Sequence, residues 1–174
     1  WQLFSSSLAE ASNSLIINAN MISKIYFPRL VIPISAIMVC FVDFLVSVIM
    51  LGGLLAWYHV VPGWRMLWLP LYTVLALLAS FGISLWLAAL NVKYRDFRYV
   101  IPFVVQFGLY FSPVGFGSGV VREKCGDLVY HLYGLNPMVG VIDGFRWALG
   151  GQVPFNGTGL VSALIVTALL LFSG

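Results

Sequence analysis

Long apolar runs alternate with short polar segments along the chain, and four of these runs have the length of a membrane-spanning helix. They cover residues 30–61, 66–92, 99–121 and 147–174. About 20 predominantly apolar residues, each advancing a helix by about 1.5 Å, cross the hydrocarbon core of a bilayer. Only a few residues separate the first three runs, so we predict that these helices are antiparallel neighbours.

Residues 1–23 form a fifth and weaker candidate span, because polar residues interrupt its apolar pattern. Such a segment crosses a membrane only if its polar side chains are buried against other helices or line a water-filled path. The polar residues are Ser5, Ser6, Ser7, Glu10, Ser12, Asn13, Ser14, Asn18 and Asn20.

Two shorter helices are predicted between the third and the fourth run. Residues 121–134 carry apolar residues at helical spacing, and Gly134 is a typical helix end. In the next segment, Asn136 is a suitable N-cap and Pro137 a suitable first helical residue. The glycines at 150–151 end that helix, which leaves it too short to span. We therefore expect two amphipathic or re-entrant helices on the external side, placed as a gate.

Acidic residues occur in two of these segments. Asp143 and Arg146 lie one turn apart in the second short helix, so we expect them to pair. Asp43 lies deep in the first long run, where an acid is by default a candidate functional residue. The alternative is a structural hydrogen bond between helices. We favour this alternative, because no basic residue lies in another run.

Small residues recur at every fourth position of the second run, at Ala76, Ser80, Ser84 and Ala88. Small side chains let membrane helices approach closely. This pattern predicts a packing seam, either within one protomer or between two, and no ligand site.

Aromatic residues share one face of the third run, where Phe103, Phe107 and Tyr110 follow helical spacing. Packing in the core or against lipid is one interpretation of this face. The other is a path for sugars, because an aromatic face offers apolar contact while its edge tolerates polar groups. The pattern alone leaves both open.

Composition places the chain in a membrane. Of its 174 residues, 61% are hydrophobic and 9% are charged, against about 45–50% and about 25% in soluble domains. The mean hydropathy is +0.98. These values exclude a soluble enzyme and a nucleic-acid-binding domain, so no nucleic acid is expected as a partner. The predicted fold class is an all-α polytopic membrane protein.

The basic residues predict the orientation, because short cytoplasmic loops are enriched in Lys and Arg. One side of the predicted topology carries Lys24, Arg29, Lys93, Arg95 and Arg98 in two short loops. The other carries Arg65, Arg122, Lys124 and Arg146, spread over longer connections. We therefore assign the first side to the cytoplasm.

Motifs for nucleotide or metal chemistry are missing. No phosphate-binding loop of the form GxxxxGK[ST] occurs, and the glycine-rich residues 115–119 lack its lysine, so they are interpreted as a helix break. His59 and His131 have no acidic or cysteine partner at ligand spacing. Cys40 and Cys125 are expected to be free thiols. No metal and no cofactor are predicted for this chain.

The segment at residues 18–29 combines cations with aromatics beside Pro28. It is interpreted either as an anchor loop that obeys the charge rule or as a docking element. In the second case Tyr26 and Phe27 fill a pocket on a partner, while Lys24 and Arg29 pair at its rim.

Taken together, these segments resemble a known family. The chain is similar to the permease subunit of type-2 ABC exporters, in the branch that exports polysaccharides, O-antigen, capsule and teichoic acid. The matching segments run in order over nearly the whole chain: residues 22–30 (ISKIYFPRL), 42–44 (VDF), 91–98 (NVKYRDFR), 111–114 (FSPV), 135–138 (LNPM) and 142–146 (IDGFR).

The resemblance implies a permease of six spans that forms a homodimer in the bacterial inner membrane and exports a lipid-linked glycan. A separate ATPase subunit binds ATP and Mg on the cytoplasmic side. Residues 1–174 would then be a fragment of the transmembrane domain with about five of the six spans, lacking the N-terminal cytoplasmic helix and the first span. The loops that contact the ATPase would contain Lys24, Tyr26, Phe27, Pro28 and Arg29 in the first, and Lys93, Tyr94, Arg95 and Asp96 in the second. Asn136, Pro137, Asp143 and Arg146 would belong to the external gate helices.

Three other functions stay open. A type-2 ABC permease for drugs or other lipophiles has the same architecture. A secondary transporter works without an ATPase and favours an ion site at broken helices. An intramembrane enzyme needs several titratable residues at one depth, whereas Asp43 stands alone there.

Overall fold

The computed structural model describes residues 1–19, 28, 30–59, 63–94, 96–116, 118, 121, 126, 130, 133–150 and 156–173. Every regular element within these residues is helical, which confirms the predicted all-α class. The elements are α1 (Gln2–Ile17), α3 (Val31–Trp57), the 3-10 helix η1 (Trp64–Trp68), α4 (Leu69–Lys93), α5 (Phe97–Tyr110), α7 (Pro137–Ala148) and α8 (Gly157–Ser173).

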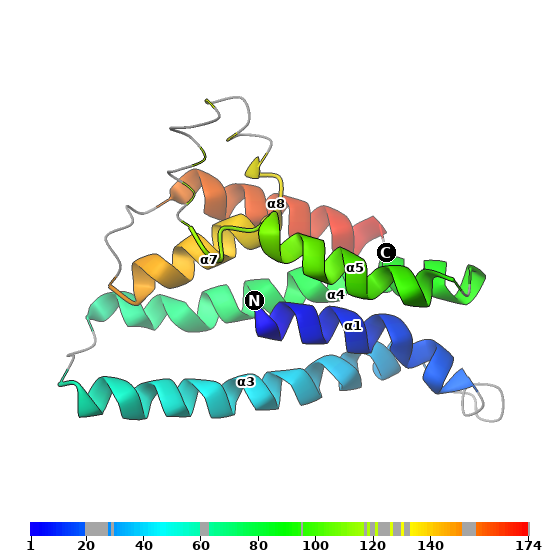
Figure 1. Cartoon of the computed structure of the whole chain (residues 1–174), viewed down its shortest axis with the longest axis horizontal. Coiled ribbons are helices and arrows are strands. Elements are labelled where there is room, and N and C mark those ends of the chain that lie inside the picture. The colour runs from blue at the N-terminus through cyan, green and yellow to red at the C-terminus, as the bar shows by residue number, and fades with distance from the viewer. Residues whose placement is uncertain are drawn as a thin grey trace.

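Helix α4 is the centre of the bundle, since it contacts α1, α3, α5, α7 and α8. In Figure 1, α1 lies between α5 and α3, while α7 and α8 pack against each other. The predicted packing seam lies on α4 as expected: Ala76, Ser80, Ser84 and Ala88 are all buried. Short side chains on the central helix therefore allow several neighbours to approach its backbone.

Two stretches have the length and apolarity of a membrane span, namely α3 and the continuous stretch Trp64–Lys93 that joins η1 to α4. They confirm the first two predicted runs as helices. The outer surface of α3 is apolar, with Val39, Ile49 and Met50 all exposed. Such a surface is unfavourable in water but not in hydrocarbon, so it is consistent with a membrane protein.

The third predicted run is wrong in its extent, because α5 ends at Tyr110 instead of continuing to residue 121. Pro113 accounts for the early end. The residue before a proline is pushed out of the helical conformation, and helices usually stop there. Fourteen residues rise about 21 Å, which is less than the roughly 30 Å of a hydrocarbon core.

The fourth predicted run is also wrong in its start. Trp147 and Ala148 belong to the end of α7, and the last helix begins only at Gly157. Apolarity continues through this junction although the helix does not, because Gly150 adopts a positive φ of 86° that ends the preceding helix.

Several polar side chains of α1 pack inside the bundle, as the condition set for residues 1–23 requires, whereas Glu10 is exposed and residues 20–23 lie outside the described residues. The Ser12 hydroxyl donates to the Leu8 carbonyl at 2.6 Å, and the Ser14 hydroxyl donates to the Ala11 carbonyl at 2.7 Å. The buried Asn91 of α4 donates to the Ser12 carbonyl and to Asn13 Oδ1. These bonds satisfy polar groups that lipid cannot satisfy.

Helix α7 begins as predicted. Asn136 is its N-cap and accepts a hydrogen bond from the Met138 N–H at 3.0 Å, and Pro137 is its first residue. Two glycines then bring the helix close to its neighbours. A Cβ atom on Gly140 would overlap the Gly159 carbonyl of α8, and one on Gly144 would overlap the Tyr72 ring of α4. The predicted helix at 121–134 lies mostly outside the described residues.

Replacing Gly140 by Ala is expected to destabilise the protein by about 1–3 kcal/mol, because the added methyl group forces two backbones apart. The midpoint of thermal unfolding of the solubilised protein should fall by several degrees. Gly53→Ala is the matched control, since nothing lies within 4 Å of a Cβ at that position of α3. An equal fall in both variants would contradict the close α7–α8 contact as the cause.

Candidate functional site

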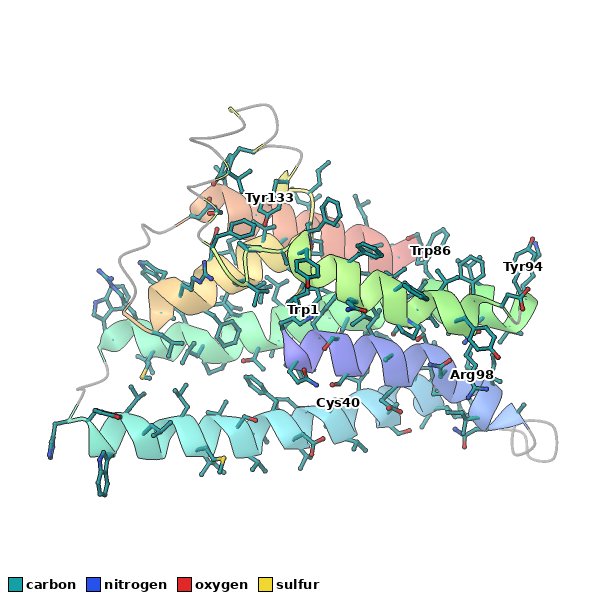
Figure 2. All side chains as sticks on the ribbon, viewed as in Figure 1. Trp1, Cys40, Trp86, Tyr94, Arg98 and Tyr133 are labelled. Atoms are coloured by element: carbon teal, nitrogen blue, oxygen red, sulfur yellow. The ribbon has the colours of Figure 1, made fainter. Side chains whose placement is uncertain are left out.

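One end of the bundle carries the loops predicted to contact an ATPase. The end of α1, the start of α3 and the turn between α4 and α5 meet there (Figure 1). In that turn Lys93, Tyr94 and Asp96 are exposed, and the Lys93 ammonium lies 5.3 Å from the centre of the Tyr94 ring. Figure 2 shows Tyr94 and Arg98 at this end.

Of the other predicted contact residues, Pro28 is exposed. The rest lie outside the described residues, namely Lys24, Tyr26, Phe27, Arg29 and Arg95. The described residues place the end of α1, the start of α3 and the α4–α5 turn at one end of the bundle, and Pro28, Lys93, Tyr94 and Asp96 are exposed.

The aromatic face of α5 points away from the bundle. Phe103, Phe107 and Tyr110 are 62%, 60% and 71% exposed. The opposite face packs inward, where Ile101 is buried and Gly108 approaches the Trp1 ring of α1. Packing within this chain's own core is therefore wrong as an interpretation of these aromatics. Contact with lipid and a path for sugars stay open.

A second outward face is polar and lies on α1. Gln2 and Glu10 are exposed, and Ser6 is half-buried on the same side of the helix. Gln2 donates to the Ser6 hydroxyl at 3.2 Å. Contact between such a polar stripe and lipid hydrocarbon is unfavourable, so this face suits contact with water or protein. Sequence reasoning noted Ser6 and Glu10 but not Gln2, and it did not separate the outward stripe from the buried serines.

Asp43 lies on α3 at the edge that faces α1. Its side chain is exposed and makes no hydrogen bond to another described residue, so the interhelical bond favoured for it is absent in the described chain. Glu10 of α1 and Asp43 both lie near enough to the buried Cys40 thiol to interact with it electrostatically, and Figure 2 shows Cys40 between the two helices. The described structure therefore brings two acids to one seam, where the sequence indicated one.

Two side chains at the ends of α7 donate hydrogen bonds to the segment that follows α5. Asn136 donates to the Ser112 hydroxyl at 3.1 Å and to the Phe111 carbonyl at 3.4 Å. Arg146 donates to the Val114 carbonyl at 2.7 Å and to the Phe116 carbonyl. Carbonyls just past the end of a helix have no intrahelical donors. We call this set of four hydrogen bonds the α7 clamp, because it ties the broken end of α5 to α7.

The predicted pairing of Asp143 with Arg146 is not formed. Asp143 is 2% exposed, and neither of its carboxylate oxygens has a hydrogen-bond partner among the described residues. Arg146 turns instead to the two carbonyls of the clamp, which helical spacing alone does not reveal. Leaving a buried polar group without a partner costs about 1–3 kcal/mol, so Asp143 is a destabilising position in α7 in the described structure.

Tyr133 interacts electrostatically with Asp143 and, like Asp143, carries a buried polar group. The Tyr133 hydroxyl is buried and has no hydrogen-bond partner among the described residues (Figure 2). Burial raises the pKa of Tyr133 to about 12; the negative charge of Asp143 adds to this rise and the positive charge of Arg146 opposes it. The phenol is therefore neutral at physiological pH and can both donate and accept.

Cavities border helix α7, among them two that differ in their lining. One of about 390 Å³ lies between α3, α4 and α7 and has an apolar lining that includes Phe44, Val48 and Phe145. The other, of about 260 Å³, reaches from α1 to α7 and is lined by Val114, Ile142 and Arg146 among others. Within the described residues, no group of three or more His, Cys, Asp or Glu side chains could hold a metal ion.

Comparison with known proteins matches residues 2–149 to the family described as ABC-2 type transporter. Two proteins named "O-antigen export system permease protein RfbA" from Klebsiella pneumoniae are each 29% identical to this chain over 98% of its length. A protein of the same name from Myxococcus xanthus is 22% identical over 84% of the chain and covers 55% of that relative.

The chain spans 64% of the length of the two Klebsiella relatives. The family match includes all of the bundle up to the end of α7, and hence the α4–α5 turn, the aromatic face of α5 and the α7 clamp. Its apolar helices are those of a membrane protein. By this match the chain belongs to the ABC-2 type transporter family.

Proposed function

We propose that this chain belongs to the permease subunit of an ATP-driven exporter that moves a lipid-linked polysaccharide of O-antigen type across the bacterial inner membrane. The observation that carries the proposal is the similarity, along 98% of the chain, to two permeases named for O-antigen export. The family match supports the transporter class independently of any single relative.

The outward faces of α5 and α1 suit such a substrate. Sugar rings combine apolar faces with polar edges, and aromatic side chains such as Phe103, Phe107 and Tyr110 contact both. The polar stripe of α1, with Gln2 and Glu10, offers hydrogen bonds to hydroxyl groups. We infer that these two faces border the path of the glycan, and that a second copy of the permease closes that path in a homodimer.

Energy comes, in this proposal, from a separate ATPase that binds ATP and Mg on the cytoplasmic side. The exposed Lys93, Tyr94 and Asp96 support a docking role for the α4–α5 turn. When ATP binding draws two ATPase subunits together, the loops move and shift the helices that follow them. Coupling requires that these loops make different contacts in the two states. Helix α7 then acts as part of the external gate.

Export of drugs or other lipophiles is the second candidate, and the apolar cavity of about 390 Å³ beside α3 favours it. A strain that lacks the permease separates the two functions. Loss of surface polysaccharide, with glycan accumulating on its carrier inside the cell, supports glycan export. Unchanged surface polysaccharide together with increased sensitivity to lipophilic toxins supports the alternative.

The triple substitution of Phe103, Phe107 and Tyr110 by Ala is expected to lower surface polysaccharide at least about tenfold, because the glycan loses its stacking surface. Immunoblots of the polysaccharide measure export, and blots of membranes confirm normal permease levels. Phe172→Ala is the matched control, since Phe172 is an aromatic of α8 that is 94% exposed. Normal export in the triple variant would remove the aromatic face from the path.

Replacing Tyr26, Phe27 and Tyr94 by Ala is expected to abolish copurification of the ATPase while leaving membrane insertion intact, because the docking side chains are lost. Stoichiometric recovery of an ATP-binding subunit with the wild type is the reference. Tyr58→Ala is the control, because Tyr58 is also an exposed aromatic residue but lies at the opposite end of α3. Undiminished recovery of the ATPase with the triple variant would refute the docking role.

A further inference from the structure

We propose that Arg146 alternates between two partners as the gate operates: the carbonyls of Val114 and Phe116 in the state seen here, and Asp143 in a second state. Arg146 is thus the positioning residue of the α7 clamp, and Asp143 is its second acceptor. This inference rests on the proposed function only in treating α7 as part of an ATP-driven gate.

The first state is defined by the clamp. Two nitrogens of the Arg146 guanidinium reach two carbonyls in the segment after α5. Because α5 carries the outward aromatic face and also contacts α1, these bonds link the gate helix to the candidate path. Release of Arg146 would leave Asn136 as the only other clamp residue, at the opposite end of α7.

The second acceptor is already in place. Asp143 precedes Arg146 by three residues on the same helix, a spacing at which Cβ atoms are about 5–6 Å apart. Its carboxylate is buried and makes no hydrogen bond among the described residues. Buried polar groups without partners are rare and need an explanation. A rotation of the arginine side chain alone, without remodelling of the helix, brings a guanidinium to this carboxylate.

Among the described residues, Arg65 is a second cation that contacts α7. Arg65 of η1 stacks over the Trp147 ring, with 5.4 Å between its guanidinium carbon and the ring centre, and Trp147 is one turn from Asp143. Arg65 contacts the ring and takes no part in the clamp. Removing Arg65 therefore tests whether Asp143 acts as the acceptor for Arg146 or for Arg65.

Disulfide cross-linking in the full permease, reconstituted with its ATPase in proteoliposomes, tests the exchange. Val114→Cys and Ile142→Cys supply the reporter pair, because both residues line the cavity that Arg146 also lines; Cys40 and Cys125 are first replaced by Ala. Without nucleotide the pair should cross-link, and a non-hydrolysable ATP analogue should lower the yield at least about threefold. In the Asp143→Asn variant the analogue should no longer lower it, whereas Asp143→Glu should restore the response.

Thr167→Val is the matched control, because Thr167 of α8 is another buried residue whose hydroxyl lacks a partner among the described residues; its response should equal that of the wild type. Arg146→Gln should give a low yield with or without nucleotide, and adding Asp143→Asn to it should change nothing further, as expected for residues that act through one contact. A normal response in Asp143→Asn, or the same loss in Arg65→Gln, would overturn the proposal. A cross-linking yield that does not change with nucleotide in the otherwise wild-type protein would overturn the proposal as well.

These outcomes are separable from the failure of glycan export. The cross-link reports on the clamp whatever substrate the permease carries. A nucleotide response that depends on Asp143, in a protein that does not export polysaccharide, would refute the proposed substrate and leave the exchange intact. Polysaccharide export that is normal in Asp143→Asn, together with an unchanged cross-link response, would refute the exchange alone.

Discussion

A bilayer core offers no hydrogen-bond partner to a peptide group, and the arrangement of the described chain follows from that constraint. Where the helices are regular, as in α3 and α4, the backbone satisfies itself. Where the backbone leaves the helical path after Tyr110, side chains from a distant part of the chain take over, and Arg146 and Asn136 supply the donors. Helix α7 therefore satisfies the carbonyls that follow α5 in addition to packing against α4 and α8.

The same constraint explains the contrast between the two outward-facing surfaces. Helix α3 presents apolar side chains such as Ile49 and Met50, which hydrocarbon accepts at no cost. Helix α1 presents Gln2 and Glu10 instead, although it lies beside α3 in the bundle. Two neighbouring helices thus face two different environments, and the seam between them, marked by Asp43 and Cys40, is where these environments meet.

Length and apolarity were enough to predict α3, α4 and the all-α class, because those properties depend only on residues within one segment. The Asn136–Pro137 start of α7 was equally predictable, since an N-cap bonds to its own helix. Small residues at every fourth position also located the buried seam of α4. All of these are local patterns, and the fold preserves them.

The wrong predictions concern features that hydropathy and helical spacing do not determine. Hydropathy alone predicted that the third run continues beyond Pro113. The backbone restriction that this proline imposes ends α5 earlier. The Asp143–Arg146 pair was predicted from helical spacing. Arg146 donates instead to carbonyls in a segment about 30 residues earlier in the chain. The outward stripe of α1 was hidden among inward serines, because only the neighbours of a helix determine which of its faces is open.

The contact between Gly140 and Gly159 has a mechanical consequence. Helices α7 and α8 touch there through their backbones, with no side chain between them to slide or compress. The two helices therefore cannot approach each other further at that point. The spacing between α7 and α8 is set there by two backbones, and any larger residue at Gly140 would have to change it.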